Sequence, residues 1–292
     1  MSSRIAEKFS SLSLAGRRAF VPYITAGDPT LSATRDLVFA LERAGADLIE
    51  LGVPFSDPLA DGEVNQAAAF RALQAGASVE GVLETIAEIR KISEIPLVLF
   101  SYLNPLLQFG LARFATEASR AGVDGVLLVD LPLEERLPGL QVLESLLARI
   151  HLVAPTTEIP RRQAIGKAAE GFLYCVARLG TTGVREQAPA EAEGLVRSMR
   201  TFCTVPACVG FGISTPEQAV SVAAYADGVV VGSALVERIG AWGSEPDLCE
   251  RIERFARPLA EGVHRASGKG GARGAHPREL KGERGTVGNS CA

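Results

Sequence analysis

Eight short apolar segments recur along the chain, each ended by a turn signal and followed by a helical pattern, and this repetition restricts the fold more than any other feature. The segments span residues 19–25, 46–52, 96–102, 125–130, 150–154, 171–176, 206–212 and 227–231. Apolar strands that alternate with helices indicate a parallel sheet covered on its outer face. Eight such units without a larger break predict a closed α/β fold, the (β/α)8 TIM barrel, of about 250 residues.

The regions around and between these strands show helical periodicity. Helices are predicted over 4–16, 31–44, 64–75, 79–92, 111–121, 134–148, 190–202 and 246–265. Thr215, Pro216 and Gln218 have the spacing of a capping box that starts one more helix. The structural alternative is a doubly wound open sheet, which would use fewer strands and carry Gly-x-Gly-x-x-Gly after the first.

The domain boundary is expected near residue 266. Residues 1–266 would form a single barrel domain that begins with a short N-terminal helix. Segment 267–292 contains seven glycines and five Lys or Arg against two Glu, a composition that predicts a disordered tail. An arm that binds nucleic acid is the alternative explanation of those charges.

Charge and hydropathy argue against several classes of partner. The formal net charge is −4, whereas a protein that binds nucleic acid needs a concentrated basic surface. No apolar run approaches the roughly 20 residues that span a bilayer. The charged residues near Met1 stand where a signal peptide would have its apolar core, so we expect a cytoplasmic protein.

Two scarce residue types limit the chemistry. Histidine occurs only at 151, 264 and 276, which makes a histidine-centred triad or a metal cluster improbable. The five lysines all lie away from strand ends, which leaves no evident Schiff-base nucleophile. The five cysteines show no Cys-x-x-Cys spacing. Acid and base chemistry is therefore expected from carboxylates, with no metal.

The second strand carries a carboxylate. Alternation places Leu48, Glu50 and Gly52 on one face, so Glu50 should point into the barrel, where burial raises the pKa of a carboxyl group toward neutrality. The proline-stiffened loop that follows would return Ser56, Asp57 and Asp61 over the strand end, so that two or three acidic groups converge. The alternative is a structural ion pair between Glu50 and an arginine.

Other candidate residues lie at strand ends, which meet at the mouth of a barrel. They are Tyr23, Thr25, Tyr102, Asp130, Tyr174 and Phe211, with backbone N–H groups at Thr182–Gly183, Gly212–Ser214 and Gly232–Ser233. The last two groups follow strands seven and eight, where such barrels hold phosphate. As alternatives, Tyr102 and Phe211 could fill the barrel, Asp130 could cap the next turn, and Gly232–Ser233 could be a simple turn.

The stretch from Glu50 to Gly62, Glu-Leu-Gly-Val-Pro-Phe-Ser-Asp-Pro-Leu-Ala-Asp-Gly, resembles the signature of the tryptophan synthase alpha chain family. Residues 25–29, 180–183, 210–214 and 232–233 match the same family in order and spacing, and the similarity covers about residues 5–265. The resemblance implies cleavage of indole-3-glycerol phosphate to indole and glyceraldehyde 3-phosphate. It also implies a beta chain partner, in an alpha2-beta2 complex, that carries the pyridoxal phosphate (PLP), with no cofactor on this chain.

The resemblance also implies individual roles. Glu50 matches the acid/base carboxylate of the family, and Asp61 matches the group that hydrogen-bonds the indole nitrogen. Residues implied to bind substrate are Tyr23, Phe100, Tyr102, Tyr174, Thr182, Gly183, Phe211, Gly212, Gly232 and Ser233, and Tyr174 is expected to hydrogen-bond near Glu50. Thr182 belongs to a polar loop that would act as a lid and contact Asp61. Pro54 and Asp57 match the loop that meets the beta chain.

The chain departs from the family pattern at two places. Glu63 stands where the family usually has proline, and the lid reads Ala177-Arg-Leu-Gly-Thr-Thr-Gly183. Three other functions therefore stay open: a non-catalytic activator of the beta chain, a phosphosugar isomerase or epimerase on the same barrel, and a lyase that works alone.

Overall fold

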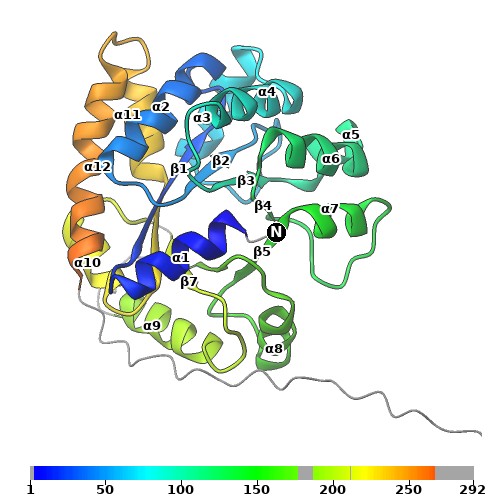
Figure 1. The fold of residues 1–292 in the computed structure, drawn as a ribbon, viewed down its shortest axis with the longest axis vertical. Coiled ribbons are helices and arrows are strands. Elements are labelled where there is room, and N and C mark those ends of the chain that lie inside the picture. Colours follow the sequence, from blue (N-terminus) through cyan, green and yellow to red (C-terminus); the bar gives the residue numbers. More distant parts are fainter. Residues whose placement is uncertain (1–2, 177–186, 211, 267–292) are drawn as a thin grey trace, which may run out of the picture.

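Eight parallel strands close into a barrel in the computed structural model, which describes residues 3–176, 187–210 and 212–266 (Figure 1). The strands are β1 (Ala19–Thr25), β2 (Ile49–Gly52), β3 (Leu97–Ser101), β4 (Gly125–Leu128), β5 (Ala148–Val153), β6 (Leu173–Val176), β7 (Ala207–Gly210) and β8 (Gly228–Val231). Each strand pairs with the next along the chain, and β8 pairs with β1. The predicted TIM barrel is confirmed, and the open sheet is excluded.

Helices surround the barrel (Figure 1). They are α1 (Arg4–Leu14), α2 (Leu31–Ala44), α3 (Glu63–Gln74), α4 (Val79–Arg90), α5 (Leu103–Phe109), α6 (Leu111–Ala121), α7 (Leu140–Leu146), α8 (Ile159–Ala168), α9 (Gln187–Met199), α10 (Pro216–Ala223), α11 (Ser233–Trp242) and α12 (Leu248–Arg265). The capping box before α10 forms as expected, with Thr215 and Gln218 exchanging hydrogen bonds. In the part of the chain that the structure describes, no helix is long and apolar enough to cross a membrane.

Three helical regions differ from expectation. Helix α5 was not predicted, α8 was expected after the fifth strand without bounds, and the helix expected over 134–148 is reduced to α7. Pro138 disfavours helical geometry at the residue before it, and Gly139 adopts a left-handed conformation with φ of 85°. The segment 133–139 is consequently an irregular loop, and β5 already begins at Ala148.

Strand alternation divides the core into an inner and an outer layer. Leu48 packs in the barrel interior with Val98 and Val230, whereas Ile49 and Leu51 pack in the layer under the helices. Helix α1 contributes Ile5, Phe9 and Leu12 to the interior cluster. Apolar side chains of α1 thus fill part of the barrel interior. Glu50 and Tyr23 lie near the C-terminal ends of β2 and β1.

Candidate active site

Glu50 is a fully buried carboxyl group inside the barrel. It lies in β2 in register with Tyr23 of β1, and its exposed fraction is 0%. Neither carboxyl oxygen has a hydrogen-bond partner among the described residues, so the alternative of an ion pair with an arginine finds no support there. Burial raises the pKa of Glu50 to about 8. The group is therefore protonated at neutral pH and has no structural bond to break when it transfers a proton.

Asp61 lies in the loop between β2 and α3 and is half-buried. Burial raises its pKa to about 6, and a hydrogen bond with the Tyr102 hydroxyl opposes that rise. The same hydroxyl accepts a hydrogen bond of 2.8 Å from the backbone N–H of Ala60. Burial, the charge of Asp61 and smaller contributions raise the pKa of Tyr102 to about 12, so the hydroxyl remains a donor. Asp61 is therefore mainly ionised at pH 7.

The phenol of Tyr23 shows that the two carboxyl groups act on one region. Burial raises the pKa of Tyr23, and the charges of Asp61 and Glu50 both raise it further. Coulomb energy falls as the distance between two charges grows, so both carboxyl groups lie within electrostatic reach of this phenol. The expected convergence of Glu50 and Asp61 at one end of the barrel is consistent with this coupling.

Aromatic rings from three strands form a wall beside Glu50. The rings of Tyr23 and Phe100 meet edge to face with centroids 5.3 Å apart, and Phe100 meets Tyr174 at 6.5 Å. Burial raises the pKa of Tyr174, and Glu50 makes the next largest contribution. Among the described residues, no hydrogen bond joins Tyr174 to Glu50, so the expected bond is not found. The two side chains interact through the charge of Glu50.

Two strand glycines make room for these phenols and were not among the expected site residues. A Cβ atom at Gly52 would overlap the Tyr23 hydroxyl, and one at Gly210 would overlap the Tyr174 hydroxyl. Glycine inside a strand often marks a close approach by another group, which was the available signal. Both glycines end their strands and so belong to the lining of the site.

The turns after β7 and β8 differ in the donors that they offer. Ser214 was expected to present an open N–H group, but that N–H donates to Oε1 of Gln218 at 2.9 Å. The N–H of Thr215, the expected cap, donates to the same oxygen at 3.3 Å. The expectation for Ser214 is therefore wrong, because the capping box uses that donor. Gly232 precedes the ten-residue helix α11, whose first N–H groups have no intrahelical partner. A Cβ at Gly232 would lie 3.4 Å from the Tyr23 ring, which places this turn beside Tyr23.

The remaining expected residues have different surroundings. Asp130 was expected, as the alternative to a chemical role, to cap the next turn. Instead its Oδ1 accepts the N–H of Leu103, the first residue of α5, at 2.8 Å. Pro54 is buried, whereas Asp57 is exposed. Thr182, Gly183 and Phe211 lie outside the described residues, as does most of the expected lid.

Buried carboxyl groups with raised pKa at one end of a closed parallel barrel are typical of a (β/α)8-barrel enzyme. A family model described as the tryptophan synthase alpha chain matches residues 9–264. The chain belongs to the tryptophan synthase alpha chain family.

Individual relatives agree with this assignment. The alpha chain of Alkaliphilus metalliredigens is 43% identical over 263 residues, which is 89% of this chain and 98% of the relative. That of Citrifermentans bemidjiense is 45% identical over 267 residues, 91% of this chain and 99% of the relative. The crystal structure of the alpha subunit from Legionella pneumophila superposes with a TM-score of 0.82 at 36% identity, covering 90% of this chain and 99% of that one. The resemblance noted from the signature is thereby confirmed.

Proposed function

We propose that this chain cleaves indole-3-glycerol phosphate into indole and glyceraldehyde 3-phosphate, with Glu50 and Asp61 as its two catalytic carboxyl groups. The family is one of lyases that catalyse this cleavage. The observation that carries the assignment of roles is the buried, unpartnered carboxyl group of Glu50, whose pKa of about 8 suits a proton donor at neutral pH.

The reaction requires a proton at carbon C3 of the indole ring. Glu50 donates that proton, and the positive charge that develops on the ring nitrogen is stabilised by the Asp61 carboxylate at the N–H. The bond between C3 and the adjacent glycerol carbon then breaks, and its electron pair returns to the ring. Glu50, now ionised, accepts the proton from the hydroxyl on that carbon, which becomes the aldehyde. Protons and electrons balance without a lysine or a metal.

The other expected residues complete this proposal. The rings of Tyr23, Phe100, Tyr102 and Tyr174, together with Phe211, would contact the indole, and Thr182 with Gly183 would approach Asp61 from the lid. The phosphate would bind at Gly212 and at Gly232–Ser233, where the N-terminus of α11 favours an anion.

Partner and cofactor follow from the family. It forms an alpha2-beta2 complex with a beta chain, and PLP is bound by the beta chain. Exposed Asp57 and Leu59, which is 92% exposed, would meet that chain, while buried Pro54 would shape their loop. We propose a cytoplasmic location, as for other biosynthetic enzymes, and a catalytic domain of residues 1–266 with a tail that takes no part in the reaction.

The test is an indole assay on the purified chain with indole-3-glycerol phosphate, with and without a beta chain. Glu50→Gln should lower indole formation by about 10³-fold, because amide nitrogen cannot replace a general acid. Glu63→Gln removes a carboxylate from the same segment at an exposed position and serves as the matched control.

Each alternative gives its own result. Stimulation of the beta chain by a wild-type protein that forms no indole would indicate a non-catalytic activator, and sugar-phosphate turnover without indole would indicate an isomerase or epimerase. Equal indole formation with and without the beta chain would indicate a lyase that works alone. Glu50→Gln should still stimulate the beta chain.

A further inference from the structure

Tyr102 occupies a position between the candidate site and the first turn of α5. It is 6% exposed, and its hydroxyl accepts the backbone N–H of Ala60, the residue before Asp61, at 2.8 Å. The phenol also lowers the pKa of the Asp61 carboxyl group. The oxygen accepts the Ala60 N–H, so its single proton is available for the Asp61 carboxylate. The Phe55 ring, with its centroid 5.4 Å from that of Tyr102, packs against the same phenol.

Asp130 holds the backbone just beyond Tyr102. Its Oδ1 accepts the N–H of Leu103, the first residue of α5, at 2.8 Å. A carboxylate at this position satisfies a donor that the helix leaves free. The charge of Asp130 also acts on the Tyr102 hydroxyl. Loss of this bond would free the backbone that sets the direction of the Tyr102 side chain.

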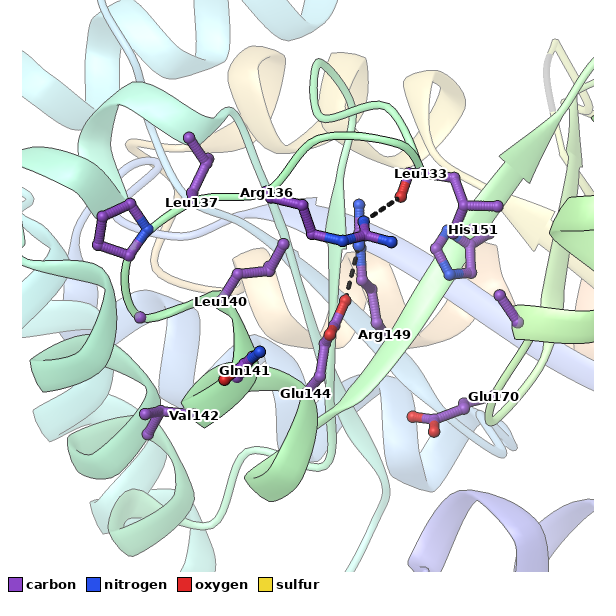
Figure 2. Close-up of a pocket in the computed structure, with 13 residues that line it drawn as sticks. Leu133, Arg136, Leu137, Leu140, Gln141, Val142, Glu144, Arg149, His151 and Glu170 are labelled. Carbon is purple, nitrogen blue, oxygen red and sulfur yellow. Dashed lines mark hydrogen bonds and ion pairs between the residues drawn. The ribbon is translucent and has the colours of Figure 1, made fainter.

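Arg149 supports the segment that follows Asp130 from the outer side of the barrel. The side chain lies at the edge of a cavity of about 660 Å³ beside α7, and it pairs with Glu144 at 2.8 Å (Figure 2). The second terminal nitrogen donates to the carbonyl oxygens of Leu131 and Pro132, each at 3.2 Å. Arg149 is only 3% exposed, so these bonds are shielded from water.

We propose that Asp130 and Tyr102 act together as positioning residues for Asp61: Asp130 fixes the start of α5, and Tyr102 in turn fixes the loop that carries Asp61. This inference rests on the proposed role of Asp61. Within the described residues, the titratable groups that act on Asp61 are Tyr102 and Tyr23, and those that act on Tyr102 are Asp61 and Asp130.

The test compares Tyr102→Phe, Asp130→Ala and Asp130→Asn in indole formation. Asp130→Asn is the matched control, because the amide oxygen still accepts the Leu103 N–H although the charge is lost. Tyr102→Phe and Asp130→Ala should each lower kcat by roughly 3- to 10-fold, while Asp130→Asn stays within about twofold. The kcat of the double variant Tyr102→Phe/Asp130→Ala should be within about twofold of the kcat of the less active single variant. Both changes remove the same function, the positioning of Asp61.

A second measurement separates positioning from general damage to the fold. The pKa of Asp61, followed by carboxyl carbon NMR, should rise in Tyr102→Phe by about 0.5–1 unit, since the interaction with the phenol that lowers this pKa is lost. Additive losses in the double variant, an Asp130→Asn as impaired as Asp130→Ala, or an unchanged pKa of Asp61 would overturn the proposal. A wild-type chain that forms no indole would instead overturn the proposed function, and the NMR result would still judge the positioning.

Discussion

The Tyr23 hydroxyl occupies the space that a side chain at Gly52 would need. This packing places a phenol from β1 against the backbone at the end of β2, two residues beyond Glu50.

We expect Gly52→Ala to lower both activity and stability. The new methyl group would push the Tyr23 hydroxyl out of its place, and overpacking of this kind costs about 1–3 kcal/mol of unfolding free energy. Indole formation should fall at least about tenfold, since a displacement of 1 Å can have a large kinetic effect. Gly194→Ala is the control, because a Cβ there meets nothing within 4 Å. Equal behaviour of the two variants in urea unfolding and in the indole assay would contradict the prediction.

The pH dependence of kcat/KM should be bell-shaped. Asp61 must be ionised and Glu50 protonated, so activity should rise as pH increases through about 6 and fall as it increases through about 8. Rates of indole formation from pH 5 to 9 provide the measurement. A profile that still rises between pH 8 and pH 9 would show that Glu50 is not the proton donor.

Glu50 should also make the stability of the fold depend on pH. Its pKa is raised from 4.5 to about 8 in the folded chain, so the folded state binds this proton more tightly than the unfolded state does. Stability contributed by the protonated group is complete below about pH 4.5 and is lost as pH rises toward 8. The unfolding free energy of Glu50→Gln minus that of the wild type should therefore increase between pH 5 and pH 8. Urea unfolding at pH 5, 7 and 9 measures this difference. A difference that does not change with pH would show that folding does not raise the pKa of Glu50.

A negative charge at the start of α11 should weaken substrate binding. Ser233→Asp places a carboxylate where the phosphate is proposed to lie, and the repulsion should raise KM about tenfold or more with a smaller change in kcat. Ser10→Asp adds the same charge at an exposed position of α1 and should leave KM unchanged. Inhibition by inorganic phosphate should weaken only in Ser233→Asp. The phosphate assignment fails if KM for both variants equals that of the wild type.

Removal of residues 267–292 should leave the barrel and its reaction intact. If residues 1–266 form the catalytic domain, as proposed, the truncated chain should keep its indole-forming activity and should unfold within about 0.5 kcal/mol of the full chain. A clear loss of either property, measured by the indole assay and urea unfolding, would assign the tail a role.

Much of the fold is readable from the sequence because strand and helix periodicity are local properties. Alternation within β2 determined that Glu50 faces the barrel interior with Leu48, and the spacing of Thr215 and Gln218 determined the start of α10. The signature from Glu50 to Gly62 identified the family without reference to any distance. These features depend on residues close together in the chain.

Contacts between distant residues could be decided only by the tertiary structure. Three contacts join separate strands and loops: the hydrogen bond from the Ala60 N–H to the Tyr102 hydroxyl, the bond from the Leu103 N–H to Asp130, and the space that Gly52 leaves for Tyr23. Barrel closure brings these groups together, and the periodicity of the sequence does not predict which of them come into contact. The sequence alone thus determined the architecture and the acidic residues at its centre, whereas packing around the closed barrel decided their partners and, through burial, their protonation.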